Sequence, residues 1–131
     1  MRVRLFLGTI ATGVLACAQP ADVPINQDFR LRLGETARIT ATDLTITFRE
    51  VSEDSRCARD VVCVWAGNGR VLLQIRRAGT DTTLALNTTL APRAAPVDGF
   101  RLELRGLAPQ PVAGQPIPPT DYTAELRVLA P

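Results

Sequence analysis

The chain of 131 residues contains no His and no Lys, and Ser occurs only at positions 52 and 55. His is the most common general base and transition-metal ligand, and a Schiff base or a Lys-centred phosphate loop requires Lys. A Ser-His-acid triad or a Cys-His pair therefore cannot be built within this chain. We expect a protein that is not an enzyme and that holds no cofactor and no metal ion.

The N-terminus has the layout of a secretory signal peptide. Arg2 and Arg4 precede an apolar run, 5–15, that is too short to span a bilayer. The segment VLAC at 14–17 resembles a bacterial lipobox, whose Cys is lipidated, although that pattern prefers a smaller or β-branched residue to Leu15. We expect a signal peptide over 1–16 and a lipid-anchored Cys17 in a bacterial cell envelope. The alternative is cleavage after Ala18, which gives a freely secreted binding module or inhibitor.

Net charge is absent from the expected mature chain. The full chain has 15 basic residues, all of them Arg, and 13 acidic residues. Removal of Arg2 and Arg4 with the signal peptide leaves 13 basic against 13 acidic residues. A neutral domain lacks the long-range field of a nucleic-acid-binding protein, so we expect no nucleic-acid partner.

The remaining chain carries the pattern of strands. Residues 17–28 contain two Pro and little periodicity, and they are expected to form a tether. From residue 29 onward, apolar residues recur at every second position, which is typical of strands with one buried face. The clearest sets are Phe29/Leu31/Leu33, Leu44/Ile46/Phe48, Val71/Leu73/Ile75, Phe100/Leu102/Leu104 and Tyr122/Ala124/Leu126/Val128.

These sets predict a single all-β domain over 29–131, with about seven strands and no helix. We expect an antiparallel β-sandwich with an immunoglobulin-like Greek key, or a partly open barrel. The segment AGTD at 78–81 predicts a hairpin turn.

The stretch EDSRCARDVVCVWAGNGRV, 53–71, holds the only Trp and two of the three Cys. A nearby pair in a secreted protein favours a disulfide between Cys57 and Cys63. Their spacing does not fit the redox motif Cys-x-x-Cys, and a zinc site would need about four ligands. Asp54 is expected to accept a hydrogen bond from the backbone N–H of Arg56 in an Asx-turn.

Trp65 shares strand phase with Cys63, which favours packing in the core against the disulfide. The alternative is an exposed binding anchor. Gly67-Asn68-Gly69 is expected to bend one long strand over 62–75. If the domain has a binding surface, we expect it to face an envelope protein or a glycan and to centre on Asp54, Arg56, Arg59 and Trp65.

Four acidic residues surround the Cys pair: Glu50, Glu53, Asp54 and Asp60. Carboxylates in a loop can bind Ca²⁺, and paired carboxylates can hydrolyse glycosides, so a carboxylate- or metal-dependent enzyme is a third alternative. Arg residues interleave with these acids, however, and the spacing lacks an EF-hand pattern. We expect a solvated loop with local ion pairs.

The Cys stretch resembles a motif of small, uncharacterised bacterial secreted proteins and lipoproteins. That motif runs Asp-Ser-Arg-Cys-Pro, a short spacer, Cys, and then Trp-Ala-Gly. Residues 54–57, Cys63 and residues 65–67 match it, whereas Ala58 replaces the usual Pro. The C-terminal stretch from 104 to 128 is also similar to that family. The resemblance implies an extracytoplasmic β domain and brings no established activity.

Overall fold

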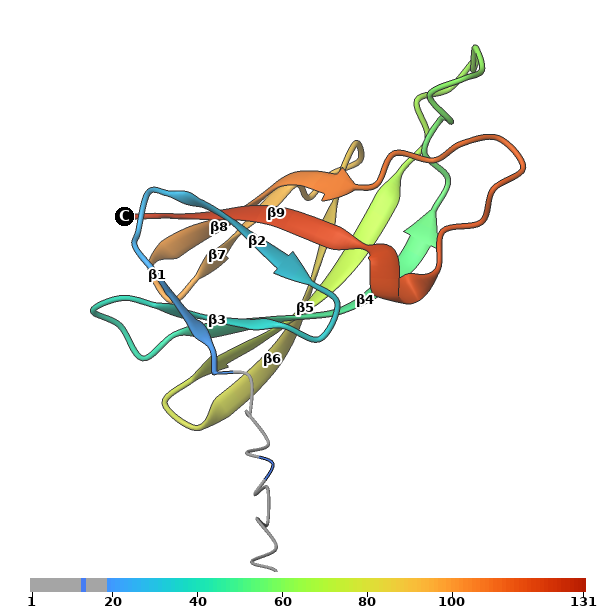
Figure 1. The fold of residues 1–131 in the computed structure, drawn as a ribbon. Coiled ribbons are helices and arrows are strands. Elements are labelled where there is room, and N and C mark those ends of the chain that lie inside the picture. Colours follow the sequence, from blue (N-terminus) through green and yellow to red (C-terminus); the bar gives the residue numbers. More distant parts are fainter. Residues whose placement is uncertain (1–12, 14–18) are drawn as a thin grey trace, which may run out of the picture.

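The computed structural model describes residue 13 and residues 19–131. The expected signal peptide, the lipidation site at Cys17 and the alternative cleavage site after Ala18 lie outside the described residues. Figure 1 shows two β-sheets packed against each other, so the predicted all-β sandwich is confirmed. In the described part of the chain, no helix is both long enough and apolar enough to cross a membrane.

The first sheet contains five strands in the spatial order β1-β3-β4-β5-β6. Their bounds are β1 Ala21–Val23, β3 Thr36–Ile39, β4 Thr45–Asp54, β5 Gly69–Arg77 and β6 Thr80–Asn87. The second sheet contains four strands in the order β2-β9-β8-β7. Their bounds are β2 Asp28–Arg32, β7 Ala94–Val97, β8 Phe100–Ala108 and β9 Thr123–Leu129, with a short 3-10 helix at Pro119–Asp121.

The described residues form nine strands where the sequence predicts about seven. One addition, β1, lies inside the segment 17–28 that is expected to be a tether. It pairs in parallel with β3, and Val23 is buried in the core. The β structure therefore begins at Ala21 instead of at residue 29. The other addition, β7, contains Pro96, which is tolerated because β7 is an edge strand.

Strand order follows chain order more closely than in an immunoglobulin-like domain. Strands β3 to β6 are consecutive and lie side by side in one sheet, whereas an immunoglobulin-like domain holds strands A, B, E and D in one sheet and C, F and G in the other. Strand β9 returns to pair with β2. The predicted hairpin turn is confirmed: Ala78 and Gly79 join β5 to β6, and both have positive φ, as a two-residue type I′ turn requires.

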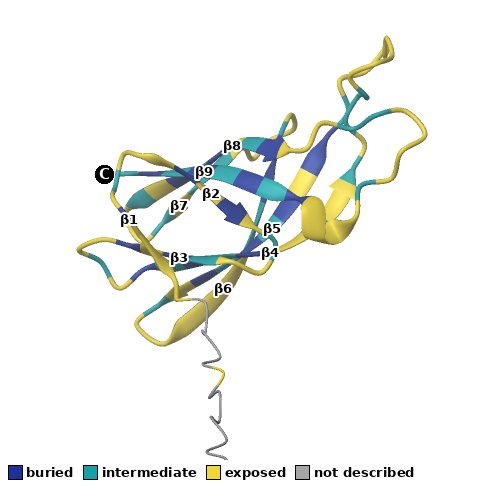
Figure 2. Ribbon diagram, in the orientation of Figure 1, coloured by how far each residue is buried: buried dark blue, intermediate teal, exposed yellow. Residues whose placement is uncertain are grey.

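The core lies between the two sheets and is built from the alternating apolar residues. Figure 2 shows buried and exposed positions alternating along the strands. The largest fully buried side chains are Phe48, Ile39, Leu44, Ile46, Leu73, Leu86, Leu102, Leu126, Val71 and Val128. Burial of each such side chain contributes about 1.5–3 kcal/mol to folding.

Candidate functional site

The Cys stretch forms a loop that joins β4 to β5 and projects beyond the sandwich (Figure 1). Backbone hydrogen bonds close its base: Ser55 N–H donates to the Asn68 carbonyl at 2.8 Å, and Cys57 N–H donates to the Ala66 carbonyl at 3.0 Å. The base thus continues the β4–β5 hairpin for a short distance. We call residues 55–68 the stapled loop.

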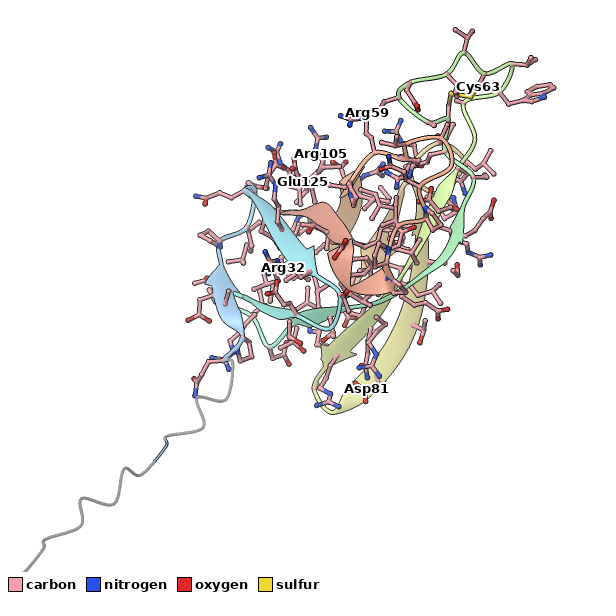
Figure 3. All side chains as sticks on the ribbon, turned by 45° about the vertical axis from the view of Figure 1, so that its right-hand side comes forward. Arg32, Arg59, Cys63, Asp81, Arg105 and Glu125 are labelled. Atoms are coloured by element: carbon pink, nitrogen blue, oxygen red, sulfur yellow. A yellow bond between two sulfur atoms is a disulfide. The ribbon has the colours of Figure 1, made fainter. Side chains whose placement is uncertain are left out.

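The predicted disulfide is confirmed, since Cys57 and Cys63 are bonded with their Cα atoms 5.9 Å apart. Figure 3 shows Cys63 in the stapled loop, at the end of the molecule from which this loop projects. A covalent bridge at this place limits the conformations that residues 57–63 can adopt. The loop therefore presents a defined surface instead of a mobile one.

An apolar cluster covers the end of this loop. The exposed fractions are 103% for Val62, 91% for Val64, 82% for Trp65 and 45% for Val61. We call these four residues the apolar tip. Exposed apolar side chains at one place mark a surface for interaction, because their contact with water is unfavourable until a partner covers them.

The exposure of Trp65 contradicts the expected packing in the core. Side chains alternate between the two faces of a sheet only within a continuous strand. The expected strand over 62–75 is not continuous. Strand β5 begins at Gly69, and Gly67 reverses the backbone with a φ of +68°. A Cβ on Gly67 would collide with the carbonyl of Ser55, so this sharp passage between loop and strand requires glycine. The bend is present, but it lies before the strand.

At the base of the stapled loop, Arg56 forms a bidentate ion pair with Asp54. Arg56 Nε lies 2.7 Å from Asp54 Oδ1, and Nη2 lies 2.8 Å from Oδ2. The same guanidinium donates to the carbonyl of Leu107 at 2.6 Å and to that of Pro109 at 2.9 Å. Because Leu107 belongs to β8, this one side chain ties the end of the first sheet to the second sheet.

Tyr122 completes the tie from the start of β9. Its hydroxyl donates to Asp54 Oδ2 at 2.8 Å. Burial raises the pKa of Asp54, but hydrogen bonds from Arg56 and Tyr122 outweigh it and hold that pKa below the ordinary value of 3.8. Burial, together with the hydrogen bond to Asp54, raises the pKa of Tyr122 to about 12. At neutral pH, Asp54 is therefore ionised and Tyr122 is protonated, as their hydrogen bond requires.

Asp54 and Arg56 thus hold the loop in place. The predicted Asx-turn is confirmed, since Arg56 N–H donates to Asp54 Oδ1 at 3.3 Å. Both side chains are only 12% exposed. This placement corrects the expectation that they lie displayed at the centre of a binding surface: among the expected residues, Arg59 and Trp65 are exposed, whereas Asp54 and Arg56 are largely buried.

The proline-rich segment between β8 and β9 supports the other side of the stapled loop. Arg59 N–H donates to the Pro111 carbonyl at 3.0 Å, and Ala113 N–H donates to the Asp60 carboxylate at 2.9 Å. The Arg59 side chain lines a groove of about 480 Å³ with Pro109, Gln110, Val112, Gln115, Pro116, Ile117, Pro118 and Asp121. Arg59 therefore places a cation in the groove between the stapled loop and the proline-rich segment.

Asn68 anchors the end of the stapled loop from within the protein. It is buried, and its amide nitrogen donates to Asn87 Oδ1 at 2.9 Å. Its side-chain oxygen accepts from the backbone N–H groups of Thr89 and Leu90. Burying an amide without such partners is costly, so these bonds fix where the loop rejoins β5. The sequence patterns do not predict the hydrogen bonds of Asn68 and Tyr122, because their partners lie far along the chain.

The acidic residues around the loop do not form one site. Glu50 and Glu53 are exposed on β4, Asp54 is paired with Arg56, and Asp60 accepts from Ala113. Among the described residues, no three His, Cys, Asp or Glu side chains lie close enough together to hold a metal ion. Comparison with protein families, with curated proteins and with solved structures finds no match to this chain.

Proposed function

We propose that this chain is a non-enzymatic protein of the bacterial cell envelope, lipid-anchored through Cys17, that binds an envelope protein with the apolar tip of its stapled loop. One observation carries the recognition role: Val62, Val64 and Trp65 are almost fully exposed on a loop that a disulfide and the Arg56 tie hold in place. A rigid apolar anchor loses little conformational entropy when it binds, and exposed Trp is enriched at protein–protein hot spots.

A protein pocket fits this surface better than a glycan does. Sugar recognition relies on flat aromatic faces, whereas three of the four residues of the apolar tip are Val. Aliphatic side chains bind by filling apolar pockets, which protein surfaces offer. Arg59 and Asp60 directly precede the tip in the chain and carry opposite charges, so this part of the loop can form polar contacts without a net charge.

The position of the tip also favours a partner that lies away from the anchoring membrane. With β1 starting at Ala21, only four residue steps separate Cys17 from the sandwich, a reach of about 14 Å. In Figures 1 and 3, the start of β1 and the stapled loop lie at opposite ends of the molecule. A domain held this closely by its N-terminus would direct the apolar tip outward.

The anchor itself is tested by the intact mass of the mature protein. A diacylglyceryl group on Cys17 supports the proposal. An unmodified chain that begins at Gln19 would favour the alternative, a freely secreted binding module, and would rule out the anchor.

The recognition role is tested by site-specific photo-crosslinking in cells. A photoreactive residue at Val62 is expected to capture one envelope protein, whereas the same residue at Leu90 is not. Leu90 is a matched control because its apolar side chain is also exposed, at 58%, but lies outside the stapled loop.

The captured protein, once purified, is expected to bind the wild-type chain and the Leu90→Ser variant equally. Trp65→Ser is expected to weaken this binding by about 30-fold, which corresponds to a hot-spot residue. Equal capture at both positions, or full affinity of Trp65→Ser, would contradict the proposal. Capture of lipid alone at Val62 would replace the protein partner with a membrane surface.

A further inference from the structure

A second feature of the fold that calls for a partner is the free edge of the five-stranded sheet. Strand β6 ends this sheet, and among the described residues no strand pairs with its outer side. Residues 80–83 are exposed, and Figure 2 shows this part of β6 uncovered. An edge of this kind presents backbone N–H and C=O groups that another strand can pair with.

The hairpin fixes which backbone groups face outward. Its two-residue turn makes Arg77 and Thr80 the hydrogen-bonded pair that closes it. Hydrogen-bonded pairs recur at every second residue, so Thr80, Thr82 and Leu84 bond to β5. The N–H and C=O groups of Asp81, Thr83 and Ala85 therefore point away from the sheet. Asn87 agrees with this alternation, since its N–H donates outward, to the Pro92 carbonyl at 2.9 Å.

The exposed part of β6 lacks the features that normally prevent strands from pairing edge to edge. Such features are Lys, Pro, a bulge and a short strand. Strand β6 has eight residues, TDTTLALN, and its pairing with β5 is regular throughout. Its one charged residue, Asp81, is already paired with Arg76, at 2.8 and 3.1 Å. The exposed edge is thus long, regular and nearly free of unpaired charge.

A groove with both apolar and polar lining lies along the same edge. It has a volume of about 700 Å³, and its lining includes the apolar side chains of Ile75, Leu84, Pro96 and Val97 together with Thr82, Arg77 and Asp98. The groove exists because β7 has only four residues, so the second sheet stops short of covering β6. Part of the inner face of β6 is consequently not covered by the second sheet.

We propose that a second copy of this chain pairs its β6 antiparallel to β6, so that the two five-stranded sheets continue into one. A two-fold axis at Thr83 places Thr83 opposite Thr83 of the second copy and Asp81 opposite Ala85. Both pairings join residues whose backbone groups point outward, as a hydrogen-bonded antiparallel ladder requires.

The same register suits the side chains. Asp81 meets Ala85, so no like charges oppose each other across the interface. The two Thr83 side chains face each other on the outer surface, where Thr–Thr pairs are favourable. On the inner face, Leu84 of one copy lies opposite Thr82 of the other, which puts an apolar side chain over each groove. Because the two copies are related by a two-fold axis, the pairings of Asp81 with Ala85 and of Leu84 with Thr82 each occur twice. A strand from another protein would need a sequence of its own that suits this edge.

The mature protein is expected to be a dimer with about twice the mass of one chain in sedimentation equilibrium, in density-matched detergent if Cys17 is lipidated. Thr83→Pro should convert it to a monomer. Proline removes an N–H that points outward and leaves the ladder between β5 and β6 intact, so the fold is retained. Thr83→Val should remain dimeric. A monomeric wild-type protein, or a Thr83→Pro variant that is folded and still dimeric, would overturn the proposal.

The register is tested by disulfide crosslinking of variants that each carry one added Cys, with the disulfide between Cys57 and Cys63 left in place. Opposed residues in a hydrogen-bonded pair have Cα atoms about 5.5 Å apart, within the range that a disulfide spans. Thr83→Cys is therefore expected to form a covalent dimer on mild oxidation. Thr82→Cys is the matched control, because Thr82 faces Leu84 in this register and should crosslink several-fold less. Equal crosslinking of both variants would overturn the register.

This interface is independent of the apolar tip. Trp65→Ser is expected to leave the dimer unchanged, and Thr83→Pro is expected to leave partner capture at Val62 unchanged. Loss of the dimer in Trp65→Ser would instead place the contact between copies at the stapled loop and would contradict pairing through β6.

Discussion

Tyr122 and Asp54 are 68 residues apart in sequence, yet the Tyr122 hydroxyl donates a 2.8 Å hydrogen bond to the Asp54 carboxylate. Asp54 ends β4 in one sheet, and Tyr122 precedes β9 in the other. Together with Arg56, the pair fastens the two sheets at the end from which the stapled loop projects. Stability of the sandwich and position of the loop therefore depend on the same few atoms.

Replacement of Tyr122 by Phe removes this hydrogen bond and keeps the ring. Because the acceptor is a charged carboxylate, we expect the free energy of unfolding to fall by about 2 kcal/mol. Urea denaturation followed by circular dichroism measures the change. An unfolding midpoint equal to that of the wild-type protein would show that the bond contributes nothing to stability.

Tyr122 is the only Tyr, so the absorbance of its phenolate can be titrated without overlap from other phenols. We expect ionisation in the folded protein near pH 12 instead of 10.0. The unfolded chain loses this proton first as pH rises, so the stabilisation is complete below pH 10.0 and is lost as pH rises towards about 12. Ionisation of the folded protein at pH 10.0 would contradict the buried hydrogen bond.

The pKa of Asp54 gives the opposite dependence on pH. That pKa lies below 3.8 in the folded protein, so the unfolded chain binds the proton first as pH falls. The stabilisation is present above pH 3.8 and decreases as pH falls below it. We expect Asp54→Asn to remove this part of the acid sensitivity, which urea denaturation above and below that pH would detect. If Asp54→Asn had the same dependence on acid pH as the wild-type protein, the stabilising role of ionised Asp54 would be contradicted.

Replacement of Arg56 by Lys keeps the charge but not the planar fork of donors. Lys cannot reach both Asp54 oxygens and the carbonyls of Leu107 and Pro109 together, so we expect a loss of about 2 kcal/mol in the free energy of unfolding. Arg59→Lys is the matched control, since the Arg59 side chain is exposed, and we expect a change below about 0.5 kcal/mol. Equal effects of both variants would show that the tie is not structural.

Gly67 allows the sharp turn of the backbone between the stapled loop and β5. Ala at this position meets the Ser55 carbonyl and an unfavourable positive φ, so we expect a loss of about 2 kcal/mol and a displaced loop. Gly106→Ala is the control, because Gly106 has no positive φ and open space around its Cα. Thermal unfolding compares the two variants, and equal melting temperatures would contradict the special role of Gly67.

Loss of the disulfide is expected to act locally. The closed loop is short, so Cys57→Ser with Cys63→Ser should lower the free energy of unfolding by about 2 kcal/mol at most. Hydrogen exchange should accelerate over 57–66 and stay unchanged in β4 and β5. Unchanged exchange in the loop would mean that its hydrogen bonds alone fix the apolar tip.

The amino-acid sequence by itself determined the features that depend on near neighbours. Alternation of apolar residues identifies most strands, because the period of two is a local property of extended chain. The turn at Ala78-Gly79, the Asx-turn at Asp54 and the disulfide between two nearby Cys are likewise short-range. These features were sufficient to predict an all-β sandwich with a stapled loop.

Only the tertiary structure decided which of those residues are displayed. Strand β1 forms because β3 offers it an edge, which no pattern in 17–28 reveals. Trp65 faces water because the chain reverses at Gly67, so the alternation read across that point assigns it to the wrong environment. The Arg56 side chain is largely buried at the base of the loop because the carbonyls of Leu107 and Pro109, at the end of β8, accept hydrogen bonds from it. Partners that are distant in sequence determine which side chains are buried. The buried side chains support the stapled loop, and the exposed side chains are available to bind a partner.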